Sequence, residues 1–415
     1  MSHDSRSDLP GPGDLLGRAR ELQPDLVDLR RRIHREPELG LENPETRSKI
    51  LAGLEGLDLD IHLHEKSSGI VAVLRGDRPG RRILLRADTD ALPMPEETDL
   101  PFRSERKDRM HACGHDAHTA MLAGAARILS EHRCGLAGEV VFMFQPGEET
   151  YGGAAVMLEE GMSEVDAAFA MHVSPLIPTG RIGTKPGPFM ASYDDFTIEI
   201  LGRGGHASMP HDCIDPVPIA AGIIQALQAF VTREIPATDP GVLTVTRVEG
   251  GTANNVIADS VTLAGTMRAM SDRTRAILIE GLSRIVKGIA GSHRASARID
   301  LVPGYPVVVN DADFEAFSRT VIEDLFGARG VVALPTPIMG AEDFAYVLER
   351  TPGAMVLLGV RPPGTKNPAP CHSSRMILDE EALPLGAALH AAIATRFLSG
   401  SSGFLPSGPR TTGAS

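Results

Sequence analysis

The feature that most constrains the fold of this 415-residue chain is an alternation of short apolar runs with amphipathic segments. Runs rich in β-branched and large apolar residues predict strands, and apolar residues at helical spacing predict helices. The predicted strands are 69–75, 82–88, 138–145, 167–172 and 354–360, and the predicted helices are 14–35, 44–54, 117–132, 313–326 and 380–398. This alternation predicts an α/β fold with a mainly parallel sheet and helices on both faces.

The order of elements changes between residues 191 and 304. The pattern there predicts, in order, strand 196–201, helix 216–233, strands 242–248 and 261–267, helix 272–290 and strand 297–302. A β-α-β-β-α-β order is typical of a ferredoxin-like α+β domain. We therefore expect a catalytic domain built from 14–190 and 305–398, a ferredoxin-like lid inserted at 191–304, and disordered tails at 1–13 and 399–415.

The composition narrows the class of protein. A formal net charge of −13 disfavours a nucleic-acid partner, which would require a basic face. The chain contains no apolar stretch long enough for a membrane span, and its first thirteen residues lack the apolar core of a signal peptide. Its four scattered cysteines do not suggest a disulfide framework. We expect a cytoplasmic protein with no membrane partner.

One short stretch, Met110 to Thr119, reads M-H-A-C-G-H-D-A-H-T. It places three histidines, a cysteine and an aspartate directly before an apolar helical run. Such borderline and soft ligands at a loop-to-helix junction indicate transition-metal binding. A solvated helix start is the alternative for the cluster taken alone.

Other candidate ligands follow the predicted strands. Asp88 and Asp90 follow one strand, Glu148 and Glu149 follow the next, and His172 ends a third. Open α/β sheets bind their ligands outside the carboxyl ends of the strands, so these side chains should converge. The candidate ligands number five, more than one tetrahedral zinc takes, which favours two metals that share a bridge. They are Cys113, His115, Glu149, His172 and His372.

Each candidate has an ordinary alternative. Cys113 is also readable as a small core residue, or as a nucleophile activated at a helix N-terminus. The Glu148-Glu149 pair is also readable as two solvated acids in a turn. His172 and His372 are also readable as structural histidines, and Asp88 as a turn cap.

Seven motifs occur in a fixed order along the chain: R-A-D-T-D-A-L-P, H-A-C-G-H-D-A-H, Q-P-G-E-E, A-M-H, G-R-G-G-H-A-S-M-P, G-G-T-A-N-N-V-I and A-E-D-F-A-Y. Together they resemble the M20 metallopeptidase superfamily, in the amidohydrolase branch of hippurate hydrolases, N-acyl-amino-acid amidohydrolases and auxin-conjugate hydrolases. The resemblance covers about residues 26–398.

The resemblance implies a role for each motif residue. Cys113 would bridge two divalent ions (Zn, Mn, Ni or Co), with the other four candidate ligands completing the shells. Glu148 would be the general base and acid, and Asp88 would orient a ligand histidine. From the inserted domain of a neighbouring subunit, His206 would polarise the scissile carbonyl. Asn255 and Arg268 would contact the substrate, and the chain would form a homodimer or higher homo-oligomer through that domain.

The expected function is metal-dependent hydrolysis of the amide bond of N-acyl amino acids, hippurate-like or N-acetyl. The alternatives are an exopeptidase or desuccinylase on dipeptides or N-succinyl substrates, a non-catalytic binding protein on the same fold, and a thiol hydrolase that uses Cys113. The chain departs from the family pattern at Ala258, Ala341 and Cys371, and in S-S-R-M after His372. These departures remove no ligand and bear on the substrate pocket. His111 and His118 are expected to have structural roles or to contact a metal ligand without binding metal themselves.

Overall fold

The computed structural model describes residues 10–149, 151–162 and 164–400. The chain divides into two compact units. Of the described residues, the larger unit comprises those up to 189, 309–336 and those from 343 onward, and the inserted unit comprises 190–308 and 337–342. Residues 190, 305–308 and 337–342 therefore group with the inserted unit, although the sequence pattern assigned them to the larger domain. Most of the two predicted tails lies outside the described residues.

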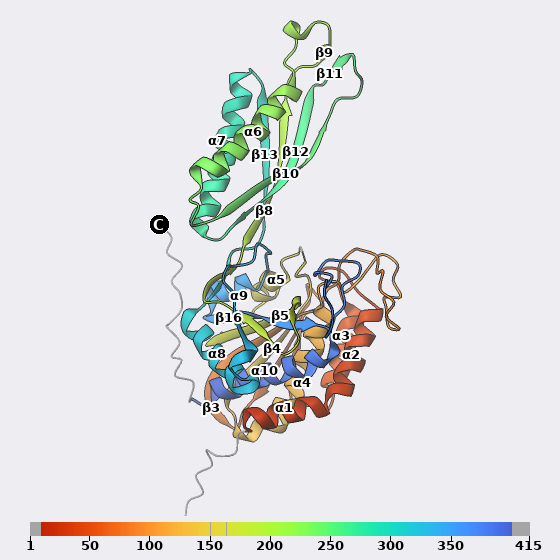
Figure 1. The fold of residues 1–415 in the computed structure, drawn as a ribbon, viewed down its shortest axis with the longest axis vertical. Coiled ribbons are helices and arrows are strands. Elements are labelled where there is room, and N and C mark those ends of the chain that lie inside the picture. The colour runs from red at the N-terminus through yellow and green to blue at the C-terminus, as the bar shows by residue number, and fades with distance from the viewer. Residues whose placement is uncertain (1–9, 150, 163, 401–415) are drawn as a thin grey trace, which may run out of the picture. The chain divides into compact units, whose positions relative to one another are not determined.

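An eight-stranded sheet forms the centre of the larger unit, with the strand order β1-β2-β4-β3-β5-β16-β6-β15 (Figure 1). Its four middle strands, β4, β3, β5 and β16, are parallel to one another. This confirms the predicted α/β class with a mainly parallel sheet. The strands are β1 (Asp60–Leu63), β2 (Ile70–Arg75), β3 (Arg78–Asp88), β4 (Ala137–Gln145), β5 (Ala167–Pro178), β6 (Ile182–Thr184), β15 (Val331–Ala333) and β16 (Gly353–Arg361), while β7 (Gly187–Met190) and β14 (Val308–Asn310) form a separate pair.

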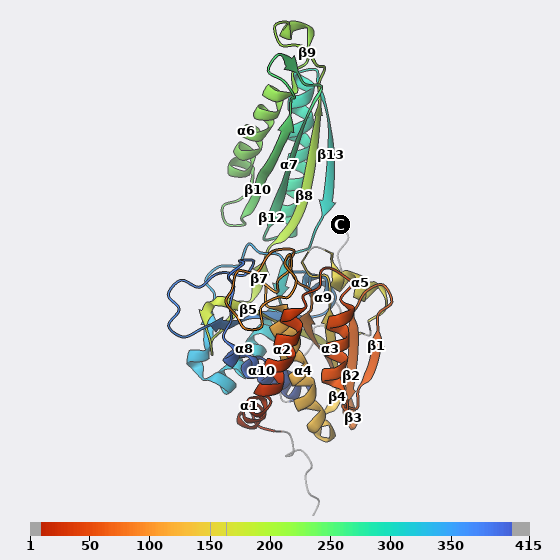
Figure 2. The ribbon, with the colours of Figure 1, turned by 90° about the vertical axis from the view of Figure 1, so that its right-hand side faces the viewer.

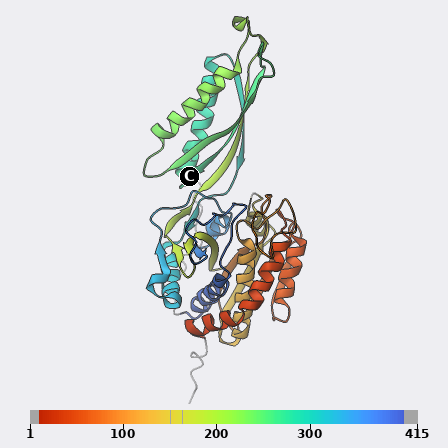
Figure 3. The same cartoon turned by 45° about the vertical axis from the view of Figure 1, so that its right-hand side comes forward.

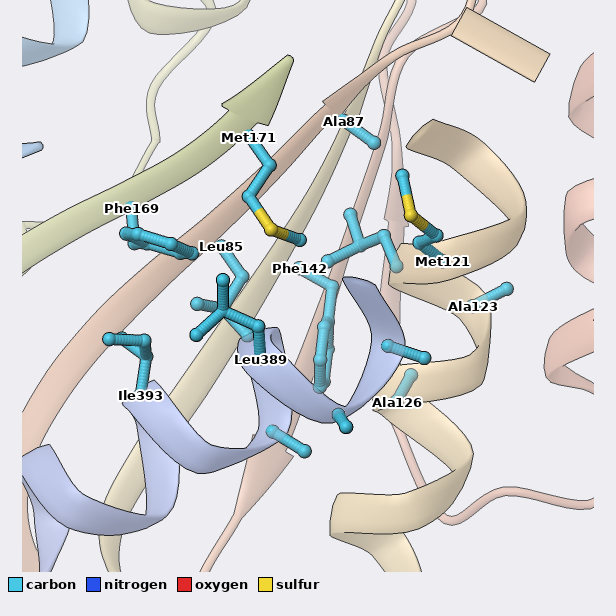
Figure 4. Close-up of a cluster of buried hydrophobic side chains, with 14 of the residues drawn as sticks. Leu85, Ala87, Met121, Ala123, Ala126, Phe142, Phe169, Met171, Leu389 and Ile393 are labelled. Atoms are coloured by element: carbon cyan, nitrogen blue, oxygen red, sulfur yellow. The ribbon is translucent and has the colours of Figure 1, made fainter. Parts of the chain in front are cut away.

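Two long helices, α4 (His115–Glu131) and α10 (Leu383–Leu398), cover one face of this sheet. Figure 4 shows Leu389 and Ile393 of α10 and Met121 of α4 against Leu85 and the other apolar side chains of the strands. Leu84, which points away from that face, is fully buried as well. Burial on both faces is the expected environment of a parallel strand. The other helices are α1 (Pro12–Glu21), α2 (Gln23–Arg35), α3 (Pro44–Leu54), α5 (Gly153–Glu159), α8 (Ala312–Phe326) and α9 (Ala345–Arg350), with 3-10 turns at Arg133–Gly135, Ala328–Gly330 and Glu380–Ala382.

The single helix predicted over 14–35 is wrong in one respect, because it is two helices that meet at Leu22. Pro24 lies in the first turn of α2. Proline has no N–H to donate and its ring crowds the preceding turn, so a helix restarts there instead of continuing. The first helix also begins at Pro12, inside the segment predicted to be a disordered tail.

The strand that carries His172 is longer than predicted. It was expected to end at His172 but continues to Pro178, paired with β16 across an irregularity near Gly359. The helix after the cysteine and histidine cluster starts at His115, two residues earlier than predicted. Both shifts place a candidate ligand inside a regular element, which fixes its backbone.

The inserted unit has the ferredoxin-like order that the sequence predicts. Its antiparallel sheet runs β10-β12-β8-β13, with α6 and α7 on one face (Figure 2). Phe196, Ile198 and Ile200 alternate along β8 and pack in a separate apolar core with the two helices. Figure 3 shows the ribbon of both helices against this sheet. The elements are β8 (Ser192–Leu201), α6 (Pro216–Glu234), β10 (Gly241–Gly250), β12 (Ser260–Ala269), α7 (Asp272–Ser292) and β13 (Ser296–Pro303), with a small pair β9 (Gly205–His206) and β11 (Val256–Ile257) and a 3-10 turn at Pro210–Asp212.

In the described part of the chain, no helix combines the length and the apolarity that crossing a membrane requires.

Candidate metal centre

The start of α4 carries two of the candidate ligands. Cys113 precedes the helix, Gly114 is its N-cap, and His115 is its first residue. Gly114 has a φ of 90°, and a Cβ at this position would overlap the side chain of Val173. Only glycine therefore lets this turn approach β5 closely enough to bring Cys113 beside His172.

The structure brings together all five predicted metal ligands. The Sγ atom of Cys113 lies 3.1 Å from Nε2 of His172. The ligand atoms of Cys113, Glu149 and His372 lie within 4.8 Å of one another. His115 forms a further group of the same size with Glu148 and Glu149. Cys113 belongs both to the contact with His172 and to the group with Glu149 and His372. Glu149 in turn belongs to the group with His115, so all five side chains form one cluster.

The donor atoms of this cluster fit divalent cations. Among the described residues, neither ring nitrogen of the fully buried His115 has a hydrogen-bond partner, and neither does Oε1 of Glu149. A buried polar atom without a partner costs about 1–3 kcal/mol, and a bound cation would remove that cost. One thiol, three imidazoles and a carboxylate are the ligands that zinc and related ions take. The residues therefore fit the pair of divalent ions that the sequence predicts.

The charges around the histidines favour a cation. Burial alone would lower the pKa of His115, but the carboxylates of Asp88 and Asp90 outweigh it and raise this pKa to about 10. Burial would likewise raise the pKa of Glu149, but His372 and His115 hold it below its usual value. The cluster thus attracts positive charge, from protons or from metal.

The two cysteines of the cluster influence each other. The thiol of Cys113 hydrogen-bonds to Cys371, which raises the pKa of Cys113 and lowers the pKa of Cys371 to about 6. Burial and the carboxylates of Glu149 and Glu148 raise the pKa of Cys113 further. A cation reverses this balance, because a thiol that coordinates a metal loses its proton.

Asp90 fixes the turn that carries both glutamates. Its buried carboxylate accepts the backbone N–H of Glu148 at 3.0 Å with one oxygen and that of Glu149 at 3.1 Å with the other. Oδ1 of Asp90 also lies 3.5 Å from Nδ1 of His115. The sequence places Asp90 after a predicted strand, but this role for its carboxylate was not predicted. The D-x-D spacing after a buried strand was the available signal.

Asp88 hydrogen-bonds to His118, which is not one of the five candidate ligands. Its Oδ1 accepts a hydrogen bond from Nδ1 of His118 at 2.5 Å, whereas its Oδ2 lies 3.6 Å from Nε2 of His115, beyond hydrogen-bond distance. Nε2 of His118 accepts the backbone N–H of Val173 at 2.8 Å, so the proton of His118 resides on Nδ1. The contacts of Asp88 therefore lead through His118 to the backbone next to His172.

A second buried carboxylate anchors α4 to α2. Asp116 accepts hydrogen bonds from Nε of Arg30 at 3.0 Å and from Nδ1 of His34 at 2.8 Å. Burial would raise the pKa of Asp116, but Arg30 and His34 outweigh it and keep the carboxylate ionised. His111 is buried beside them, and burial lowers its pKa to about 3, so its ring is neutral. Asp116 thus ties the helix that carries His115 to α2.

The three remaining predicted residues belong to the inserted unit. His206 lies exposed on β9, and its Nδ1 accepts the N–H of Ser208 at 3.1 Å, which leaves Nε2 as the protonated nitrogen. The carbonyl of Asn255 accepts the N–H of Ala207 at 3.1 Å, so His206 and Asn255 lie on neighbouring segments. Arg268 lies on β12, with its guanidinium 5.6 Å from the centre of the Tyr193 ring. The part that these residues play in the site stays a prediction.

Comparison with known proteins gives a consistent result. Residues 84–396 match the family described as peptidase family M20/M25/M40. IAA-amino acid hydrolase ILR1-like 2 of Arabidopsis thaliana is 40% identical over 378 residues, which cover 90% of this chain and 85% of that protein. N-acetylcysteine deacetylase of Bacillus subtilis is 40% identical over 371 residues, which cover 89% of this chain and 96% of that protein.

Two further relatives extend the comparison. Thermostable carboxypeptidase 1 of Saccharolobus solfataricus is 36% identical over 386 residues, covering 91% of this chain and 96% of that protein. The crystal structure of the Bacillus subtilis YXEP protein, described as a dinuclear metal-binding peptidase of the M20 family, superposes with a TM-score of 0.79 at 37% identity. That match covers 91% of this chain and 99% of the YXEP chain.

Proposed function

Because this chain belongs to peptidase family M20/M25/M40, in its amidohydrolase branch, we propose that it hydrolyses the amide bond of N-acyl amino acids with the help of two divalent metal ions. The observation that carries the proposal is the single cluster formed by Cys113, His115, Glu149, His172 and His372, with Glu148 beside it.

Glu148 is the proposed general base and acid. Its carboxyl group is buried, lies within 4.8 Å of the ligand atoms of His115 and Glu149, and has its backbone fixed by Asp90. Bound divalent ions would supply Lewis acidity to the water and to the scissile carbonyl. Glu148 would take the proton from the attacking water and then give it to the leaving amine nitrogen.

The proposal assigns substrate contacts to the inserted unit. His206 of a neighbouring subunit would donate its Nε2–H to the carbonyl oxygen, where loss of one such donor costs on the order of a hundredfold or more in rate. Arg268 would pair with the carboxylate of the amino-acid part, and Asn255 would contact the amide or acyl group. A homodimer through the inserted unit follows from this assignment.

The ligand set also bears on the metal. A thiolate, imidazoles and one carboxylate favour zinc, cobalt or nickel over magnesium, and manganese remains a candidate because of the carboxylate and histidines. We propose zinc as the ion to test first.

A second function has one specific observation in its favour. Thermostable carboxypeptidase 1, by its name a peptidase, is 36% identical to this chain. Two other similar proteins are named for IAA-amino acid conjugates and for N-acetylcysteine. N-acyl amino acids carry an acyl group where peptides carry an N-terminal residue. The pocket that receives this group therefore decides which of the two substrate classes is hydrolysed.

A substrate panel on the metal-loaded protein separates these functions. The panel contains N-acetyl, N-benzoyl and indole-3-acetyl amino acids, together with dipeptides and N-succinyl amines, and the readout is release of the free amine. We expect turnover of at least one N-acyl amino-acid series well above that of any dipeptide. Preference for dipeptides would favour the exopeptidase, and tight binding without turnover across the panel would favour a binding protein.

A further inference from the structure

One residue of the cluster has no place in the proposed ligand set. Cys371, directly before His372, offers its Sγ to a group with Sγ of Cys113 and Nε2 of His172, and these atoms lie within 4.8 Å of one another. The residue is half-buried. The chain departs from the family pattern at this position, so its role cannot be taken from the resemblance.

The backbone explains how two successive side chains reach the same cluster. The N–H of His372 donates to the carbonyl of Ala112 at 2.9 Å, which holds the 371–372 segment alongside Cys113. His372 has a φ of 65°, in the left-handed region that a histidine seldom adopts. In an extended segment the side chains of neighbouring residues point to opposite sides. The left-handed turn at His372 breaks that alternation, and Cys371 and His372 both have ligand atoms within 4.8 Å of the Cys113 sulfur.

The position of the Cys371 sulfur is tied to the other ligand segments. It lies 4.0 Å from the carbonyl oxygen of Cys113 and 3.9 Å from that of Val173, the residue after His172. A tetrahedral ion with metal–sulfur bonds of about 2.3 Å and metal–nitrogen bonds of about 2.0 Å separates its ligand atoms by roughly 3.4–3.8 Å. The Cys113–His172 separation of 3.1 Å lies just below that range, and the separations from the Cys371 sulfur are at most 4.8 Å, so one ion can be reached by all three atoms after side-chain adjustment.

We propose that Cys371 is a sixth metal ligand, which gives a second thiolate to the ion held by Cys113 and His172. The inference rests on the proposed metal centre and refines it. When the sulfur–metal bond forms, the thiol proton leaves to solvent and the oxidation states do not change. Two thiolates make this half of the centre soft, so it selects zinc over harder ions such as manganese.

The competing interpretation is that Cys371 only packs against the apolar core, with which it is in contact. The two interpretations differ in the number of sulfur atoms bound to metal. If Cys113 bridges both ions and Cys371 binds one, each zinc has on average about 1.5 sulfur neighbours, against about 1.0 with the bridge alone. Zinc-edge X-ray absorption on the wild-type, fully zinc-loaded protein measures this number without any substitution.

Variants supply the second measurement. Cys371→Ser is compared with Cys134→Ser, a control that removes an exposed thiol outside the cluster. In the cobalt-substituted protein, the sulfur-to-cobalt charge-transfer absorbance should fall by about one third in Cys371→Ser, as one of three sulfur–metal bonds is lost. Zinc affinity relative to manganese should fall by at least about tenfold. Cys134→Ser should change neither quantity.

The outcomes distinguish a failure of the proposed role of Cys371 from a failure of the proposed metal centre. A sulfur number near 1.0, or a cobalt spectrum unchanged in Cys371→Ser, overturns the role of Cys371 and leaves the five-ligand centre intact. Failure of the wild-type chain to bind zinc at all overturns both. A sulfur number near 1.5 together with the loss of absorbance supports the sixth ligand.

Discussion

At the scale of single residues, the placement of Glu148 depends on the carboxylate of Asp90. The two oxygens of Asp90 accept the backbone N–H groups of Glu148 and Glu149, the proposed base and a proposed ligand. A backbone shift of about 1 Å at a reacting group can cost on the order of a hundredfold in rate. Asp90 is therefore a positioning residue for both glutamates.

The substitution Asp90→Asn tests this role. It turns one acceptor oxygen into an NH₂ group that faces an N–H donor. We expect kcat to fall by on the order of a hundredfold, with a loss of about 1–3 kcal/mol in the free energy of unfolding. The matched control is Asp60→Asn on the exposed edge strand β1, which should leave kcat unchanged. A wild-type kcat in a folded Asp90→Asn variant would contradict the assignment.

That Cys113, His115, Glu148, Glu149 and His172 would converge could be predicted from the sequence, because they lie in short motifs at or near the ends of predicted strands. The role of Asp90 could not, since it depends on how a turn after β4 lies over the end of β3. The sequence also left open which histidine Asp88 contacts. Sequence spacing does not show whether a carboxylate reaches His115 or His118, which differ by one turn of α4.

At the scale of elements, a buried arginine joins the carboxyl ends of β3 and β4. Arg86 donates to Asp88 at 2.7 Å, to Asp343 at 2.9 Å and to the side-chain oxygen of Gln145 at 2.8 Å. Arg86, Asp88 and Asp343 are all fully buried. The network ties the end of β3, which carries Asp88, to the segment before α9.

The substitution Arg86→Met leaves the carboxylates of Asp88 and Asp343 buried without this cation. Removal of one partner from a buried ion pair costs about 3–5 kcal/mol. We expect the free energy of unfolding, measured by denaturant titration, to fall by that amount. The exposed Arg78→Met on β3 is the control and should change it by less than about 0.5 kcal/mol. A similarly small change for Arg86→Met would show that the network does not stabilise the sheet end.

Helix α10 contains a buried histidine that should make the protein sensitive to acid. His390 packs edge-on against Phe169 at 5.5 Å, and burial lowers its pKa to about 3. The unfolded chain binds the proton near pH 6.5, so stability is lost as the pH falls from about 6.5 toward 3, by about 1.4 kcal/mol per pH unit.

We therefore expect His390→Leu to weaken this pH dependence. Unfolding titrations at pH 7.5 and pH 5.0 give the comparison, with the exposed His211→Leu as the control. Burial also lowers the pKa of His111 to about 3. The His390→Leu variant should therefore still lose some stability on acidification, because His111 remains. An equal loss of stability in wild type and His390→Leu would exclude His390 as a source.

The regular elements were predictable because apolar periodicity and burial agree along them. Errors arose where a local effect overrode the period, as at Pro24, or where pairing with β16 extended β5 past His172. Short elements such as β6 and β15 carry too few residues for a period to be visible.

At the scale of the whole molecule, the proposed metal ligands and general base lie in the larger unit, and several proposed substrate contacts lie in the inserted unit. The β-α-β-β-α-β order was enough to predict the inserted fold, because each of its elements is long and periodic. The grouping of residues 337–342 with that unit was not predictable, since it depends on packing and not on a pattern within those residues. The proposed action of His206 across a subunit boundary requires a direct test.

Mixing two inactive variants provides that test. Glu148→Gln lacks the base in its own site, and His206→Ala lacks the donor that its neighbour would use. In a mixed dimer one site has both groups intact, so random reassortment should restore activity at roughly a quarter of all sites. Each variant alone should be nearly inactive. No recovery in a co-expressed mixture would indicate that His206 does not act on a neighbouring site.

The central claim is that the cluster around Cys113 is a catalytic centre for two metal ions. The most direct measurement is a titration of the chelator-stripped protein with zinc, in which bound zinc and hydrolysis of an N-acyl amino acid are followed together. We predict no turnover without metal and a rise in activity that saturates at about two ions per chain. Full turnover by the stripped protein would contradict the claim.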